Sequence, residues 1–131
     1  MSAVDVHFVD TTFRDGAQSL WAGGIRAGMI EAVAAAMDRA GFDAIEVPLG
    51  ANFMKKFVRD CREDPWDMAR MLARAMPNAI KGTMAGAHII PFEAPPPRAM
   101  VELYYGRLAQ IGALNRTQLT CNTTDQLTRT F

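Results

Sequence analysis

Three polar side chains that could do chemistry follow directly on an apolar stretch near the start of the chain. Arg14 and Asp15 form an Arg-Asp-Gly sequence with Gly16, and Gln18 comes two residues later. Residues 4–13 are rich in β-branched and aromatic side chains without a breaker, which predicts a strand. A guanidinium, a carboxylate and an amide would then lie where a strand ends and a loop begins. Proteins of the α/β class commonly place their chemistry there.

Strand and helix patterns alternate along the rest of the chain. Runs of β-branched or apolar residues predict three further strands, over residues 42–49, 79–88 and 116–122. Apolar residues spaced three and four apart predict the helices, one ending at residue 40 and the others over residues 53–61, 65–76 and 98–111. Residues 50–52 are expected to form a turn, and residues 91–97, with four prolines, an extended loop. The last helix is expected to bury one face, formed by Met100, Leu103, Tyr104, Leu108 and Ile111.

Two helix starts differ in how well the local sequence can cap them. Asp64 suits the N-cap position, and Pro65 suits the first helical position because it has no N–H to leave unpaired. The helix that stops at Gly41 begins near Ala27 and Gly28, which offer no side-chain oxygen. We therefore expect a capped start for the first of these helices and a poorly capped start for the second.

The order β-α-β-α-β-α-β predicts an α/β fold with parallel strands joined by right-handed crossovers. Four strands at this spacing are about half of a TIM (β/α)8 barrel, which needs about 250 residues. A small open parallel sheet is the other possibility. On the first interpretation residues 1–131 are one incomplete domain, the N-terminal half of the barrel. The first strand is not followed by Gly-x-Gly-x-x-Gly or by a phosphate loop, so a nucleotide site is not expected.

Composition narrows the class of protein further. Fourteen basic residues cancel fourteen acidic ones, which argues against nucleic acid as a partner. No apolar run approaches the roughly 20 residues of a membrane helix, and the N-terminus has no signal-peptide pattern. Cys61 and Cys121 are far apart, in no metal or redox spacing, and are interpreted as reduced thiols. These observations predict a cytoplasmic globular domain.

Residues 10–22, Asp-Thr-Thr-Phe-Arg-Asp-Gly-Ala-Gln-Ser-Leu-Trp-Ala, carry a resemblance to a known family. They resemble the carboxyltransferase domain of biotin-dependent enzymes, the group of pyruvate carboxylase, oxaloacetate decarboxylase alpha and transcarboxylase. Arg-Asp-Gly alone would indicate only the wider superfamily of metal-dependent barrels that includes isopropylmalate synthase and hydroxymethylglutaryl-CoA lyase. The continuation Gln-Ser-Leu-Trp-Ala is more specific to the carboxyltransferases. Weaker similarity at residues 44–47, 63–66 and 75–78 extends the resemblance over about residues 5–125.

The resemblance implies roles for the three polar residues. Asp15 would ligate a divalent metal ion (Zn, Mn or Co), and a carboxylate suits such a cation. Arg14 and Gln18 would stabilise an enolate or carboxylate oxygen during catalysis. The implied activity moves a carboxyl group between carboxybiotin, held on a carrier domain or protein, and a 2-oxo acid or related acid.

The family completes its metal site with a carboxylated Lys and two His from later strands, and these do not follow in this sequence. The resemblance therefore implies that the chain is inactive without the remainder of the barrel or a complementary subunit, and that it acts in an oligomer. Four strands would also leave two open sheet edges.

The sequence departs from the family pattern at several positions. Met54 follows the second strand where the family has an Asp that helps with the keto acid. Ala85 stands where an Arg holds the pyruvate carboxylate, and Phe92 stands where a Tyr follows. Cys121 stands where an acidic residue is common. These changes leave the acceptor acid open, because a bidentate Arg clamp has no substitute in Ala.

Two other functions stay open. One is a lyase or aldolase of the same superfamily, which dependence on a biotin carrier would separate from a carboxyltransferase. The other is a non-catalytic half-barrel that serves as a subunit or interaction module. Asp10 and Glu46 are interpreted as satisfied polar groups within the predicted strands rather than as catalytic groups.

Overall fold

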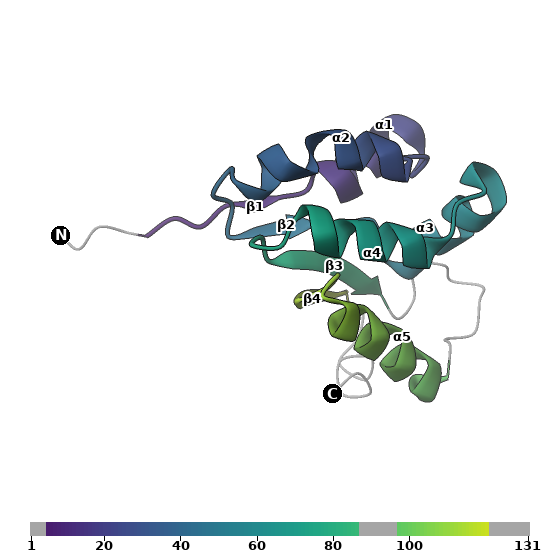
Figure 1. The fold of residues 1–131 in the computed structure, drawn as a ribbon. Helices are drawn as coiled ribbons and strands as arrows, with labels where there is room; N and C mark the ends of the chain where they lie inside the picture. The colour runs from purple at the N-terminus through teal and green to yellow at the C-terminus, as the bar shows by residue number, and fades with distance from the viewer. Residues whose placement is uncertain (1–4, 87–96, 121–131) are drawn as a thin grey trace.

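The computed structural model describes residues 5–86 and 97–120. They form one four-stranded sheet, in which all neighbouring strands are parallel and follow chain order: β1 (Val9–Asp10), β2 (Ala44–Glu46), β3 (Lys81–Gly86) and β4 (Arg116–Thr120). Figure 1 shows this order from purple to yellow. The predicted parallel α/β fold is confirmed.

Helical segments join the strands. They are η1, a π-helix (Thr12–Gly16), α1 (Ala17–Trp21), α2 (Ala27–Asp38), α3 (Ala51–Lys56), η2, a second π-helix (Phe57–Cys61), α4 (Pro65–Ala75) and α5 (Arg98–Ile111). Right-handed crossovers between strands in chain order always return on the same side of a sheet. Accordingly α2, α4 and α5 lie on one face, and no described helix covers the other (Figure 1).

The hydrophobic core fills the space between the sheet and its helices. It is formed from the buried sides of every layer, including Ile30 of α2, Ile45 of β2, Phe53 of α3, Leu72 of α4 and Leu108 of α5. Each of these five side chains is at most 1% exposed. Burial of side chains of this size provides most of the driving force for folding. The sheet is therefore held from its helix side.

The first strand is much shorter than expected, and the expected loop after it is helical. Of the described residues 5–13, only Val9 and Asp10 join the sheet, and η1 begins at Thr12 where the strand was predicted to continue. The Asp10 carboxylate accepts hydrogen bonds from the backbone N (3.0 Å) and the hydroxyl (2.9 Å) of Thr12. An acidic side chain bonded two residues ahead favours a turn over extended backbone. The prediction of a strand through residue 13 was wrong for that reason.

Other boundaries moved less. The helix expected from residue 53 begins at Ala51, so the predicted turn at residues 50–52 is shorter. The helix over residues 98–111 has the predicted bounds and ends at Gly112, whose φ of +79° suits glycine. Its buried stripe was predicted only in part. Met100, in the first turn, is 61% exposed. Leu103 is 75% exposed, because it lies about 100° around the helix from the half-buried Tyr104. Residues 87–88 and 121–122 of the expected strands lie outside the described residues.

The two helix starts behave differently, as expected. Asp64 accepts a hydrogen bond from the backbone N of Trp66 at 2.8 Å and so caps α4. No neighbouring side chain caps α2. Instead Glu63, 36 residues later, accepts from the backbone N of Ala27 at 2.9 Å. A distant carboxylate thus takes the place of a local cap and favours the positive end of the helix.

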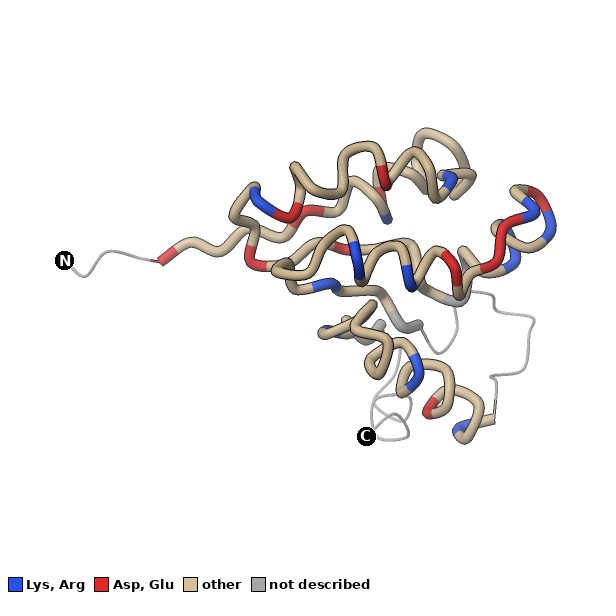
Figure 2. The backbone as a smooth tube through the Cα atoms, in the orientation of Figure 1, with Lys and Arg blue, Asp and Glu red and all other residues tan. Residues whose placement is uncertain are grey.

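Charges of both signs are spread along the chain. Figure 2 shows Lys and Arg interspersed with Asp and Glu over the described residues, without a large region of one sign. No helix among these residues is long and apolar enough to cross a membrane.

Candidate active site

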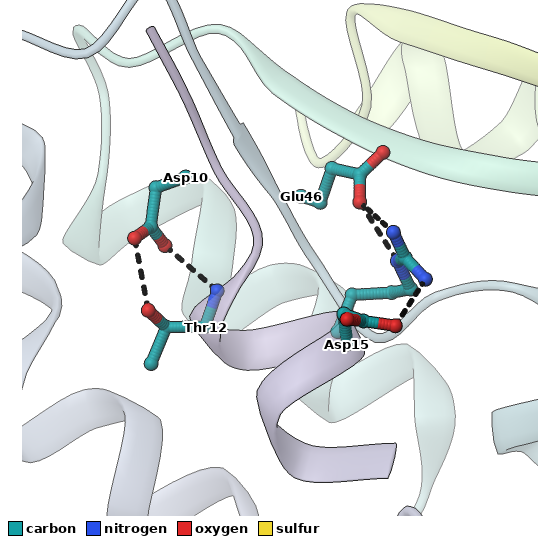
Figure 3. A network of polar contacts seen from close by, with 5 residues as sticks. Asp10, Thr12, Asp15 and Glu46 are labelled. Atoms are coloured by element: carbon teal, nitrogen blue, oxygen red, sulfur yellow. Dashed lines mark hydrogen bonds and ion pairs between the residues drawn. The ribbon is translucent and has the colours of Figure 1, made fainter. Parts of the chain in front are cut away.

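The π-helix η1 positions the Arg-Asp pair at the carboxyl end of β1. The carbonyl of Thr11 accepts hydrogen bonds from three backbone N–H groups, those of Arg14 (3.2 Å), Asp15 (2.7 Å) and Gly16 (3.2 Å). The π-helix is rare and is often found at functional sites. The start of this turn is fixed by Asp10, whose carboxylate accepts both hydrogen bonds from Thr12 (Figure 3). Arg14 and Asp15 therefore leave the sheet from a well-determined backbone.

Arg14 reaches across to the neighbouring strand. Its Nε donates to Glu46 Oε2 at 2.7 Å, and its Nη2 forms an ion pair with the same oxygen. Its Nη1 donates to Asp15 Oδ1 at 3.0 Å. The side chains of Arg14 and Glu46 are 13% and 7% exposed. The guanidinium thus lies between the two carboxylates, those labelled Glu46 and Asp15 in Figure 3. Since β1 and β2 are parallel, their carboxyl ends meet at one edge of the sheet, and the network lies there.

The structure brings two of the three predicted site residues together. Asp15 contacts Arg14 and is 59% exposed. Gln18 lies on α1, is exposed, and makes no hydrogen bond to either of them within the described residues. All three stand on helical segments rather than on the predicted loop. The arrangement offers a charge-assisted donor in Arg14 and an accessible carboxylate in Asp15, and of these two groups the guanidinium is the one able to bind an anionic substrate.

A resident metal ion does not fit the described part of the chain by itself. Residues 5–86 and 97–120 contain no group of three or more His, Cys, Asp or Glu that could hold a metal ion. Asp15 supplies one accessible carboxylate, whereas a catalytic metal typically has three protein ligands. Its predicted role as a metal ligand stays a prediction that depends on groups from elsewhere.

The positions that depart from the family pattern are described only in part. Met54 on α3 is half-buried, and its Sδ lies 3.1 Å from the hydroxyl of Tyr104 on α5, so this position packs against a helix. Ala85 lies in β3, but its side chain is outside what the structure describes, as are Phe92 and Cys121.

Glu46 was interpreted as a satisfied polar group, and in the structure its partner is Arg14, one of the predicted site residues. It is 5% exposed at the end of β2, in a run otherwise made of apolar residues. A buried carboxylate needs a cation or several donors beside it. That requirement could have identified Arg14 as its partner, since Arg14 was predicted at the carboxyl end of the first strand and Glu46 within the second.

Parallel strands in chain order with helices on one face, and an arginine network at the carboxyl ends of two strands, are features that part of a (β/α)8 barrel would share. No family model matches the chain. It is similar to the carboxyl transferase domain of Rhizobium etli pyruvate carboxylase, determined with 3-bromopyruvate, at a TM-score of 0.80 and 26% identity. The match covers 95% of this chain and 21% of that one. The same domain with pyruvate and biocytin gives a TM-score of 0.74, also at 26% identity, over 87% and 19% of the two chains.

Sequence comparison finds relatives of the same kind. One of the pyruvate carboxylase subunits of Methanocaldococcus jannaschii is 42% identical over 73 residues, which are 56% of this chain and 13% of the relative. The large subunit of the 2-oxoglutarate carboxylase of Hydrogenobacter thermophilus is 39% identical over 69 residues, 53% of this chain and 10% of the relative. The chain thus spans a small part of these enzymes. The predicted resemblance to biotin-dependent carboxyltransferases, and to part of their barrel, is confirmed.

Proposed function

We propose that the chain forms the first half of a biotin-dependent carboxyltransferase barrel. Once the remainder of the barrel is present, in the same polypeptide or another, it moves a carboxyl group between carboxybiotin and a 2-oxo acid or related acid. The observation that carries this proposal is the Arg14 network at the carboxyl ends of β1 and β2, on a fold similar to a carboxyl transferase domain. Both relatives quoted above are named for 2-oxo acids, pyruvate and 2-oxoglutarate.

Each predicted residue has a role in this reaction. Removing or adding a carboxyl group beside a carbonyl passes through an enolate, and Arg14 donates hydrogen bonds to that developing charge. Gln18 adds a neutral donor from α1. Asp15 would supply one ligand to a divalent metal ion, Zn, Mn or Co, whose other ligands would come from the remainder of the barrel. Such an ion would supply Lewis-acid polarisation of the carbonyl.

The open parts of the sheet favour a completing partner. Within the described residues β1 and β4 each pair on one side only, and unpaired strand edges attract further strands. Val9, at the β1 edge, is 41% exposed, and Arg116 of β4 is exposed. We infer that the remainder of the barrel covers the edges at β1 and β4 and the face of the sheet on which no described helix lies. A biotin carrier delivers the carboxyl group, and the assembled enzyme is a cytoplasmic oligomer.

Carboxyl transfer by the complete enzyme, with Arg14→Ala as the variant, tests the proposal. The chain joined to the remainder of its barrel should carboxylate a 2-oxo acid only when a carboxylated biotin carrier is supplied. Arg14→Ala should lower turnover about 10²- to 10³-fold, as expected for loss of a donor to a developing oxyanion. Arg59→Ala is the matched control, because Arg59 pairs with Asp60 on the exposed surface of η2. Equal turnover in Arg14→Ala and Arg59→Ala would remove Arg14 from the mechanism.

A lyase or aldolase of the same superfamily is the second candidate, favoured by Met54, which packs against Tyr104 where the carboxyltransferases have an acid. It would cleave its substrate without a biotin carrier, so the same assay separates the two. A non-catalytic half-barrel would show neither activity after the barrel is completed.

A further inference from the structure

Glu46 is a buried acid that the proposed reaction does not use directly. It ends β2, is 5% exposed, and directs its carboxylate at the side chain that follows β1 (Figure 3). Burying a carboxylate costs free energy unless charge and hydrogen bonds offset it. Arg14 provides both, through Nε at 2.7 Å and through Nη2. Well-packed apolar residues in place of a buried ion pair often stabilise a fold as well as the pair does. Stability alone therefore does not explain why Glu46 and Arg14 are paired here.

The contacts of Arg14 fix the orientation of its guanidinium. Glu46 takes the edge formed by Nε and Nη2, and Asp15 takes one N–H of Nη1. A guanidinium has five N–H donors in a rigid plane. Within the described residues Nε and one N–H of Nη1 are in hydrogen bonds and Nη2 is in an ion pair, so a second N–H on Nη1 and one on Nη2 that points away from Glu46 remain for a ligand. Because the plane is rigid, the position of Glu46 determines where those two donors point.

We propose that Glu46 is a positioning residue for Arg14, holding the guanidinium in its working orientation before substrate arrives. The inference rests on the proposed function of Arg14 and goes beyond it, since Glu46 itself need not touch substrate. The asymmetry between the two acids supports it. Glu46 is nearly enclosed at 7% side-chain exposure, whereas Asp15 is 59% exposed and free to exchange partners with solvent. The enclosed acid holds the arginine, and the exposed one can release it.

Nuclear magnetic resonance of the chain tests the positioning without any activity. Arg14 Nε–H should exchange with water far more slowly than Nε–H of Arg59, whose pair with Asp60 is exposed. In Glu46→Gln the slow Arg14 signal should be lost, whereas the control Asp60→Asn should leave it unchanged. If Arg14 exchanges as fast as Arg59 in the unaltered chain, the proposal is wrong. That first comparison holds even if Glu46→Gln fails to fold.

Kinetics of the complete enzyme test the consequence for catalysis. Glu46→Gln should lower kcat about 10- to 100-fold with a smaller change in KM, as expected when a catalytic group is misplaced rather than lost. Guanidinium ion at millimolar concentration should partly restore Arg14→Ala, because Glu46 still offers the acceptor, but not the double variant Arg14→Ala/Glu46→Gln. Equal rescue in both variants, or unchanged kcat in Glu46→Gln, would overturn the proposal. If the unaltered enzyme transfers no carboxyl group, the proposed function fails, and the exchange measurement still decides the role of Glu46.

Discussion

Tyr104 of α5 ties the last described helix to the segment that follows β2 at the site edge of the sheet. Its hydroxyl donates to the carbonyl of Leu49 at 2.8 Å and lies 3.1 Å from Met54 Sδ. Leu49 is fully buried. Its carbonyl would therefore lose a partner that water cannot easily replace if the hydroxyl were removed. Tyr104→Phe makes that change and keeps the ring, which packs against Trp66 and Tyr105.

The expected magnitude follows from the loss of one hydrogen bond to a buried acceptor. Such a loss costs about 1–3 kcal/mol of unfolding free energy. The nearby Met54 sulfur, itself only a weak acceptor, gives the carbonyl no compensation. At pH 8 we expect a loss of about 1–2 kcal/mol, measured by urea unfolding followed through tryptophan fluorescence.

The pH dependence provides a second, sharper expectation. Burial, with a smaller contribution from Tyr105, raises the pKa of Tyr104 well above its ordinary value of 10.0. The folded chain then keeps the phenol neutral while the unfolded chain ionises it. The contribution of the neutral Tyr104 phenol to the free energy of unfolding is fully present below pH 10. It declines as pH rises above 10, by up to about 1.4 kcal/mol per pH unit. Tyr104→Phe lacks this decline, so its deficit should shrink to near zero by about pH 11.

Tyr105→Phe is the matched control. Burial also raises the pKa of Tyr105, but within the described residues its hydroxyl has no hydrogen-bond partner. Tyr105→Phe should therefore lower the free energy of unfolding only slightly at pH 8. Like Tyr104→Phe, it should also remove one tyrosine's share of the fall in stability above pH 10. A Tyr104→Phe deficit no larger than that of Tyr105→Phe at pH 8, or a deficit that stays constant up to pH 11, would refute this account of the contact.

Two further predictions concern contacts that join distant parts of the chain. Glu63→Ala removes the acceptor for the backbone N of Ala27 and should cost about 1 kcal/mol, as loss of a helix cap does, with Glu63→Gln costing less in the same urea measurement. Burial alone would raise the pKa of Asp38, but hydrogen bonds from Ala79 and Asn78 outweigh it and hold the pKa below its ordinary value of 3.8. The stabilisation from Asp38 should therefore be present above pH 3.8 and be lost as pH falls through the lower folded value. In Asp38→Asn the free energy of unfolding should therefore fall less steeply as pH is lowered below 3.8. An unchanged fall would contradict this role of Asp38.

Much of the fold could be predicted because local patterns agreed with it. The α4 start at Asp64 and Pro65 and the full span of α5 were recognisable from capping and periodicity. The strand ends were not, because pairing partners determine them. Phe8 illustrates this. Its carbonyl accepts from Asp43 N at 2.9 Å and its own N donates to the Asp43 carboxylate, so a side chain takes a place that a strand would have filled.

The site was predictable in composition but not in geometry. Arg14, Asp15 and Gln18 were identified from residue type and position, and the first two do meet. The π-helix that carries Arg14 and Asp15 could not be anticipated, because five residues hold too little periodicity to indicate any helix. Its cause is a chain of short-range polar contacts from Asp10 to Thr12, and such contacts compete with extended backbone only once the strand has ended.

The balance of charge at the site gives a reason why an anionic substrate would need positive charge from outside the described residues. The Arg14 guanidinium lies between the two carboxylates of Glu46 and Asp15, so one cationic side chain faces two acidic ones. A 2-oxo acid is itself an anion and gains little from approaching such a group. Glu46 is buried against Arg14, so a positively charged group from outside the described residues would have to approach Asp15, the exposed carboxylate. We therefore expect anion binding to appear only when the remainder of the barrel supplies that charge. In a titration with oxamate, the chain alone should bind far more weakly than the complete enzyme, and Asp15→Asn should narrow the gap by strengthening binding to the chain alone.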